Sequence, residues 1–120
     1  MEKFFAVAVG GSLGALLRYA LAHLGNQGEF PLGTLIANSL GCFLIGVGIV
    51  VLKSTPEPMR LLLVTGGLGA LTTMSTFSFE VIALVNDSRW LHAASYWALT
   101  NILAIGFCAG GYWLSLRMFS

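Results

Sequence analysis

Glycines and small hydroxyl residues interrupt an otherwise apolar stretch between positions 66 and 80. Three glycines, at positions 66, 67 and 69, precede five Ser or Thr residues, at positions 72, 73, 75, 76 and 78. In lipid, such a segment must be buried in protein or must line a polar cavity, because its freed backbone groups need partners. Carbonyls at the end of the first half of a broken helix can hold a cation, and N–H groups at the start of the second half favour an anion. The chemistry expected of this stretch is therefore ion binding.

The side chains after the glycines form a polar face. Thr72, Thr76 and Glu80 are spaced four apart and share one face of a helix, while Met74 and Phe77 lie three apart on an adjacent face. The threonines either form a polar track or bond back to their own backbone. Glu80 is the only acidic residue well within an apolar context, which makes it a candidate functional group. Its place near the end of the segment also fits an interfacial position.

Polar residues also fall inside the other apolar segments. Asn38 needs a hydrogen-bond partner in hydrocarbon, and that partner is either another helix or an occupant of a pore. Arg18 either snorkels to the interface or faces a water-filled cavity, where its charge would attract an anion. Tyr96 and Thr100 are four apart in the last segment and share a face. No nucleophile–base or metal-ligand constellation appears in the sequence, so an enzyme is the least favoured function.

Composition identifies the elements that must position these residues. The chain has 120 residues, of which 57% are hydrophobic and 9% charged, whereas soluble domains carry about 25% charged residues. We predict an all-α membrane protein with a single domain, residues 1–120. Uncharged runs predict four transmembrane helices, at about residues 4–24, 31–52, 60–85 and 91–116, with the third broken near its middle. Small residues at Gly10 and Gly14, and at Gly106 and Gly110, predict close helix packing.

The charges at the ends of the spans predict the topology. Residues 1–28 begin like a signal peptide, but no small-residue cleavage site followed by a soluble domain appears, so we keep them as the first span. Lys or Arg at positions 3, 53, 60 and 117 share one side, against positions 18 and 89 towards the other. This bias places both termini in the cytoplasm. Because the bias is narrow, insertion in both orientations stays open.

Net charge and cysteine usage restrict the partners. The formal net charge is +1, which argues against a nucleic-acid partner. Cys42 and Cys108 both fall in predicted spans, and their spacing matches no metal motif. We interpret both cysteines as small packing residues.

Three sequence motifs resemble the signatures of the CrcB/Fluc fluoride channel family. They occur across the first three predicted spans in the order and spacing of the family, and the third motif is long and specific. The last span is similar to the family mainly in character. The motifs are Gly10-Gly11-x-x-Gly14-Ala15-x-x-Arg18-Tyr19, then Gly33-Thr34-Leu35-x-x-Asn38-x-x-Gly41, and then Gly66-x-x-Gly69-x-x-Thr72-Thr73-x-Ser75-Thr76-Phe77-Ser78-x-Glu80.

This resemblance implies an antiparallel, dual-topology homodimer in the cell membrane. Two fluoride pores would form between the subunits and protect the cytoplasm from accumulated fluoride. The resemblance also implies a structural sodium ion (Na+) on the two-fold axis, held by the backbone carbonyls of Gly69 and Thr72 from both subunits. Arg18 matches the basic residue of the family near the vestibule.

The resemblance also implies the lining of the pore. Asn38 matches the pore asparagine of the family, Phe77 matches one of its two aromatic rings, and Met74 occupies the position of the other ring. The last span resembles the polar track of the family at Tyr96 and Thr100, with Ala104 where a hydroxyl residue is expected. The expected fluoride pore residues are Asn38, Met74, Thr76, Phe77, Glu80, Tyr96 and Thr100.

Two other membrane functions stay open from the residues alone. A small dual-topology proton-coupled multidrug or cation antiporter would share the length, the number of spans and the weak charge bias. It would need a titratable carboxylate at the membrane centre, and the interior of the first span has none. A structural membrane subunit without transport would use the glycines and Asn38 only for packing.

Overall fold

The computed structural model describes residues 1–119, and every regular element among them is a helix. The third apolar segment is divided into four consecutive helical pieces. The elements in chain order are α1 (Glu2–Gly25), α2 (Leu32–Val51), α3 (Glu57–Arg60), the π-helix η1 (Leu61–Leu68), α4 (Gly69–Leu71), α5 (Met74–Asn86) and α6 (Trp90–Phe119).

Four stretches of the described chain are long and apolar enough to cross a membrane. They are Glu2–Gly25, Leu32–Val51, Glu57–Asn86 and Trp90–Phe119. This confirms the prediction of an all-helical chain with four candidate spans. Many large apolar side chains on these helices are exposed on the single chain, as expected where the surroundings are lipid or another protein surface.

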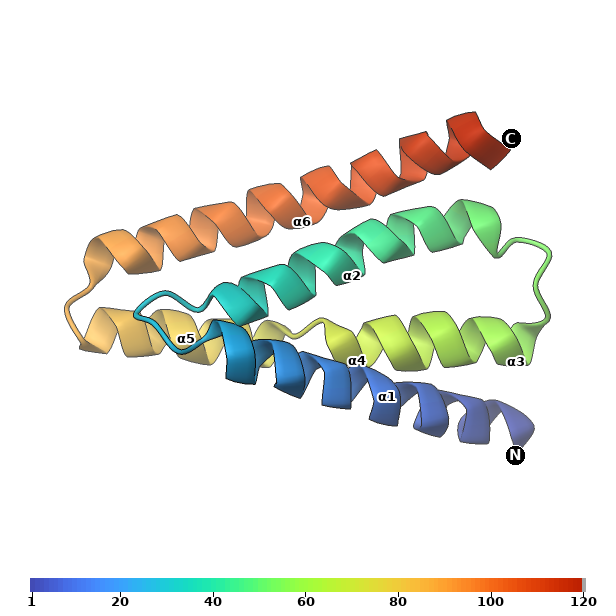
Figure 1. Ribbon diagram of the computed structural model, residues 1–120, viewed down its shortest axis with the longest axis horizontal. Helices are drawn as coiled ribbons and strands as arrows, with labels where there is room; N and C mark the ends of the chain where they lie inside the picture. Colours follow the sequence, from blue (N-terminus) through green and yellow to red (C-terminus); the bar gives the residue numbers. More distant parts are fainter. Residues whose placement is uncertain (120) are drawn as a thin grey trace.

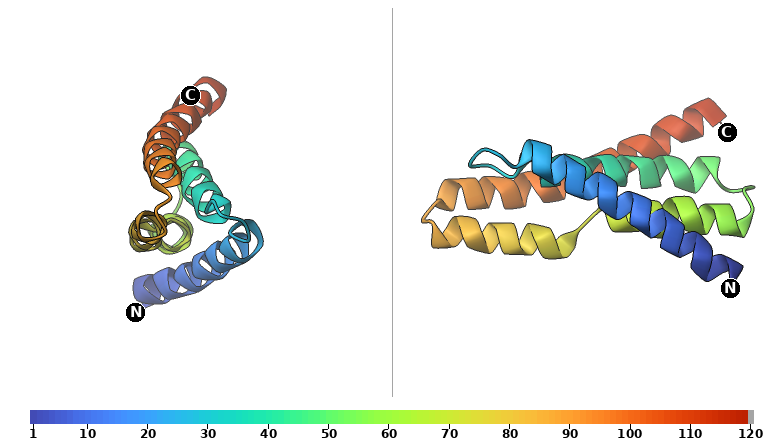
Figure 2. Two further views of the ribbon diagram at one scale, coloured as in Figure 1. Left: turned by 90° about the vertical axis from the view of Figure 1, so that its left-hand side faces the viewer. Right: turned by 60° about the horizontal axis from the view of Figure 1, so that its bottom comes forward.

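The helices associate as two pairs. The first helix, α1, packs along η1 and α4, while α2 packs along α6 (Figure 1). Both termini lie at one end of the molecule with the α2–α3 connection, and the α1–α2 and α5–α6 connections lie at the other end. Seen end-on, α1 and α6 lie at opposite extremes of an open arrangement (Figure 2). The chain is therefore a splayed set of helices rather than a closed bundle.

Glycines set the close approach within each pair. A Cβ on Gly10 or Gly14 of α1 would overlap backbone carbonyls of η1. On the other pair, a Cβ on Gly46 or Gly111 would overlap a carbonyl of the facing α6 or α2 helix. Small residues at such crossings let backbones pack closely, as predicted for α1. The close packing predicted at Gly106 and Gly110 is not found within the single chain, because a Cβ at either position would meet nothing within 4 Å.

Candidate functional site

The helix of the third span is interrupted between α4 and α5. Thr72 has φ −83° and ψ 150°, and Thr73 has φ −150° and ψ 118°, so both have extended backbone. The first half ends at Leu71, and the second half begins at Met74. Carbonyls at the end of α4 and N–H groups at the start of α5 therefore lack their usual helical partners.

The Asn38 side chain of α2 bonds to the extended peptide groups of Thr73. Its Oδ1 accepts from Thr73 N at 2.7 Å, and its Nδ2 donates to Thr73 O at 3.3 Å. Asn38 is 7% exposed. A primary amide offers an acceptor and a donor side by side, so it pairs with the N–H and the C=O of one extended residue. The sequence left a helix contact or a pore contact open, and the structure shows the helix contact.

Arg18 reaches the end of the first half of the third span. Its Nε donates to Ala70 O at 2.9 Å from a half-buried position on α1. The last carbonyls of a helix carry partial negative charge, and a guanidinium stabilises them by hydrogen bonding and by its charge. The sequence left snorkelling to the interface and a water-filled cavity open, and this bond directs Nε of Arg18 toward the end of α4.

The threonines around the interruption have separate roles. Thr73 Oγ1 accepts from Thr76 N at 3.1 Å, which makes Thr73 the N-cap of α5. Thr72 Oγ1 donates to Leu68 O at 3.2 Å and so bonds back to its own helix. The cap at Thr73 was not predicted from the sequence. Its signal was a threonine directly ahead of a helical segment, where a hydroxyl commonly caps the first turn.

The carbonyls of Gly69 and Thr72 lose the donors that a continuous helix would provide. In such a helix, Thr73 N would donate to Gly69 O, and Thr76 N would donate to Thr72 O. Here Thr73 N donates to Asn38 Oδ1, and Thr76 N donates to Thr73 Oγ1. Gly69 is exposed and Thr72 is half-buried on the single chain. Both carbonyls are thus open to another partner.

Glu80 is the centre of a hydrogen-bond network on the α5 side of the interruption. Its Oε1 accepts from Tyr96 Oη at 2.8 Å, and its Oε2 accepts from Asn26 Nδ2 at 3.0 Å and from Thr34 Oγ1 at 3.1 Å. Thr34 is 1% exposed and Tyr96 0%. Asn26 Oδ1 in turn accepts from Gly33 N at 2.7 Å. Both carboxyl oxygens are engaged inside the protein, so Glu80 is more than an interfacial charge.

Polar contacts also hold the α1–α2 and α5–α6 connections, which lie at the same end of the molecule as Glu80. Asn26, directly after α1, was missed as a site residue, and its only sequence signal was the turn composition of the α1–α2 connection. Farther out, Arg89 Nη2 donates to Glu29 Oε1 at 2.8 Å, and the two side chains form an ion pair. The hydrogen bond from Arg89, and then its charge, lower the pKa of the Glu29 carboxyl.

A cavity of about 220 Å³ lies beside the interruption, between α2, α5 and α6. Among the described residues, Thr100 Oγ1 is the one buried side-chain oxygen or nitrogen without a hydrogen-bond partner. A buried hydroxyl without a partner is uncommon and indicates a missing acceptor or donor. The cavity is lined by Asn38, Cys42, Thr72, Thr73, Met74, Phe77, Thr100, Asn101 and Ala104.

Phe77 lies between this cavity and the Glu80 network. It is 6% exposed, and its ring meets that of Tyr96 edge-on, with centroids 5.1 Å apart and planes at 65°. Met74, in contrast, is 71% exposed at the open side of the cavity. A second cavity of about 180 Å³ borders Glu80 and Asn26 at the end of the connections. The order along α5 is therefore cavity, aromatic pair, carboxyl network and second cavity.

The expected pore residues fall into three groups in the structure. Asn38, Met74, Phe77 and Thr100 line one cavity, and Glu80 and Tyr96 form the adjoining network. Thr76 is half-buried on α5 and does not line that cavity. Its backbone N–H, rather than its hydroxyl, takes part in the site through the Thr73 cap.

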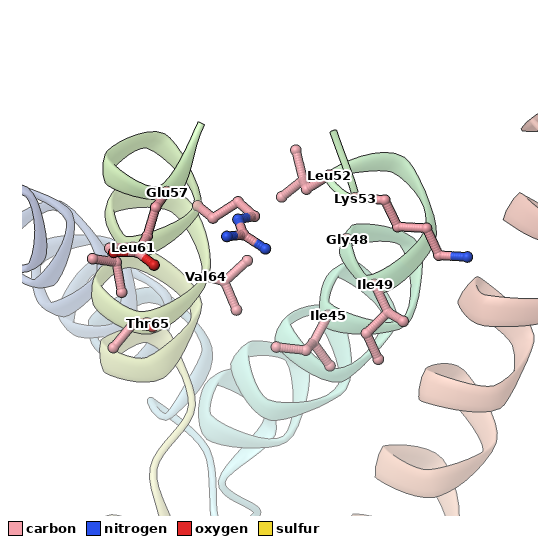
Figure 3. Close-up of a pocket in the computed structure, with 10 residues that line it drawn as sticks. Ile45, Gly48, Ile49, Leu52, Lys53, Glu57, Leu61, Val64 and Thr65 are labelled. Carbon is pink, nitrogen blue, oxygen red and sulfur yellow. The ribbon is translucent and has the colours of Figure 1, made fainter. Parts of the chain in front are cut away.

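A larger cleft of about 410 Å³ lies between α2 and the α3–η1 segment, near the end with both termini. Figure 3 shows apolar side chains on its two walls, with Ile45 and Ile49 on α2 and with Val64 of η1 directed toward α2. Lys53, at its rim, points away from the facing helix. None of the expected site residues lines this cleft, so we treat it separately from the site beside the interruption.

Comparison with known proteins connects this geometry to one family. The sequence profile described as CrcB-like protein, Camphor Resistance (CrcB), matches residues 5–112. A protein of Hydrogenobaculum sp. named fluoride-specific ion channel FluC is 42% identical over 117 residues, which cover 93% of this chain and 96% of that protein. Proteins of the same name from Salinibacter ruber and Aquifex aeolicus are 44% and 41% identical, over 92% and 93% of this chain and 87% and 95% of theirs.

Proposed function

The chain belongs to the CrcB-like family, and on that premise we propose that it is a fluoride channel through which the ion leaves the cytoplasm passively. It is a multi-pass protein of the cell membrane, and its role is transport rather than catalysis. The single observation that carries the proposed path is the cavity beside the interruption, where the buried Thr100 hydroxyl has no partner. Fluoride accepts hydrogen bonds strongly, so it is a suitable occupant for such a donor.

The donors around the cavity fit the needs of a small, strongly hydrated anion. A channel must replace the water around the ion at closely spaced sites without holding it too tightly. Thr100 Oγ1 can donate one bond, and the Asn38 amide keeps one N–H beyond the one given to Thr73 O. The edge of the Phe77 ring carries partial positive charge and adds a weaker contact. These groups come from three helices and surround one space.

The electrostatics of the interruption favour an anion on the α5 side. The first N–H groups of α5 give its N-terminus partial positive charge. Arg18, bonded to Ala70 O on the α4 side of the interruption, adds a full positive charge that raises the local anion concentration. Glu80 has the opposite sign, but three donors are directed at its carboxyl group. We propose that these donors offset its repulsion and let fluoride pass beside Tyr96.

We propose that two chains form the complete channel as an antiparallel, dual-topology homodimer with two pores. Support comes from the open side of the cavity, where Met74 and Asn101 are exposed and a second subunit would close the wall. Large apolar side chains such as Leu16 on α1 and Ile105 on α6 are exposed on the single chain, and a partner would cover them. Chemical crosslinking in membranes, followed by counting subunits per particle, tests the dimer.

We further propose that a structural sodium ion is held by the carbonyls of Gly69 and Thr72 from both subunits. The support is that both carbonyls have lost their helical donors to Asn38 and Thr73. Carbonyl oxygens suit a hard cation, and such an ion would supply fixed positive charge near the two pores. Crystals grown with a heavier monovalent cation should show anomalous scattering between the two interruptions, and its absence would exclude the site.

Fluoride efflux from reconstituted liposomes tests the channel itself. A passive channel moves charge, so fluoride measured with an electrode should leave only after a potassium ionophore provides charge compensation. Efflux that needs no ionophore would instead indicate coupling to protons, as in the alternative of a proton-coupled antiporter. No efflux under either condition would favour a structural subunit. Thr100→Val, which keeps the shape but removes the hydroxyl, should reduce the rate, and an unchanged rate would remove Thr100 from the path.

A further inference from the structure

Cys42 faces the cavity beside the interruption. It follows Asn38 by four residues on α2, so the two side chains share a face of the helix. Cys42 is half-buried and lines the same cavity as Asn38 and Thr100. The sequence predicted that both cysteines only fill space. That interpretation does not explain why one thiol borders an unfilled cavity.

Thr100 also borders this cavity and is a second observation that favours a ligand there. Thr100 is 8% exposed, lines the cavity and has no hydrogen-bond partner among the described residues. Most of the cavity lining is apolar, but the Asn38 amide and the extended backbone of Thr72 and Thr73 also border it. A thiol in such a place can be reached by whatever enters the cavity.

We propose that the Cys42 thiol lies on the fluoride path and binds soft, thiophilic metal ions, mercury(II) among them, which close the path. The inference rests on the proposed fluoride channel. With mercury(II) chloride, the S–H bond and one Hg–Cl bond break, an S–Hg bond forms, and a proton and a chloride ion leave. No electron is transferred. Soft metals select sulfur ligands over the hydroxyl and amide groups that border the same space.

An adduct on Cys42 takes part of the cavity and lies against the donors that fluoride needs. The space measures about 220 Å³, and one water molecule takes roughly 30 Å³ of it. A chloromercury group on Cys42 adds two heavy atoms to this space and would lie beside Asn38 and Thr100. Fluoride would then lose both the volume and the donors that replace its hydration.

Cys108 provides a matched control in the same chain. It is also half-buried, but it lies on α6 where its carbonyl packs against Gly46, and it does not line this cavity. The test compares fluoride efflux before and after mercury(II) chloride for the unmodified chain, Cys42→Ala and Cys108→Ala in liposomes. Each variant is scored as its own ratio of treated to untreated rate. Should Cys42→Ala fail to fold, Cys42→Ser takes its place.

We expect loss of efflux in the unmodified chain and in Cys108→Ala, recovery with excess dithiothreitol, and no loss in Cys42→Ala. Equal loss in Cys42→Ala, or continued efflux from protein whose intact mass shows mercury on Cys42, would overturn the inference. If the untreated protein conducts no fluoride, the proposed function fails separately. In that case, peptide mapping of the mercury-treated protein tests whether the Cys42 thiol faces the cavity. Modification of Cys42 at a lower mercury concentration than Cys108 supports this position, and the reverse order overturns it.

Discussion

Asn38→Asp separates the structural role of this side chain from its role in the path. Aspartate has nearly the same shape and keeps an oxygen that accepts from Thr73 N, the shorter of the two bonds at 2.7 Å. It replaces the Nδ2 donor, 3.3 Å from Thr73 O, with a second oxygen. The substitution therefore removes one hydrogen bond and adds a negative charge beside the cavity.

Two energy terms follow from this geometry. Losing the hydrogen bond to the half-buried Thr73 carbonyl costs about 0.5–1.5 kcal/mol of stability. A carboxylate about 4 Å from the path opposes an anion by about 4 kcal/mol at an effective dielectric constant of about 20. Since about 1.4 kcal/mol corresponds to a factor of ten, fluoride occupancy should fall by about a thousandfold. The effect on transport is therefore expected to exceed the effect on stability.

The assay combines fluoride efflux from liposomes with thermal unfolding in detergent. Asn101→Asp is the control, because Asn101 lines the same cavity but bonds only to Trp97 O of its own helix. Both aspartate variants should suppress efflux, and only Asn38→Asp should also lower the melting temperature. Efflux by folded Asn38→Asp within about a factor of ten of the unmodified rate would refute the placement of this amide on the path.

Other substitutions test the packing, the cap and the outer ion pair. Gly14→Ala places a Cβ against an η1 carbonyl and should prevent folding as judged by size-exclusion chromatography, whereas Gly106→Ala meets open space and should be tolerated. Thr73→Ala removes the N-cap of α5 and should cost about 1 kcal/mol in denaturant unfolding, with Thr73→Ser restoring it. Because Arg89 lowers the pKa of Glu29, the pair stabilises the fold above the ordinary carboxyl pKa and stops doing so as the pH falls through the lowered pKa. Glu29→Gln should remove this part of the acid dependence of the melting temperature, and an unchanged pH profile would show that the pair contributes nothing.

Hydropathy was enough to predict the four helical spans, because the length of an apolar run is a local property of the chain. The close approach of α1 to a neighbouring helix was also predictable, because the spacing of Gly10 and Gly14 is a local property of the chain. The pairing of the glycines on α6 was not predictable, since only the crossing point with α2 decides that Gly111 is buried and Gly106 is open.

The partners of the polar residues depend on contacts between distant parts of the chain. Sequence alone marked Arg18 and Asn38 as costly in lipid, but their bonds to Ala70 and Thr73 join residues 52 and 35 positions apart. Asn26 escaped notice because a turn asparagine is ordinary until a carboxyl group such as Glu80 lies next to it. The fluoride pore and the sodium site stay predictions that the efflux and scattering experiments test.

The interruption of the third span also constrains how the protein is made. The side chains that reach it from outside the span, Arg18 and Asn38, both precede it in the chain and belong to α1 and α2. A nascent chain is synthesised from its N-terminus, so both partners have left the ribosome before the interruption does. Entering lipid without them would leave backbone groups unsatisfied at several kcal/mol each. The third span is therefore expected to integrate stably only against the first two, which makes the order of segments in the gene an order of assembly in the bilayer.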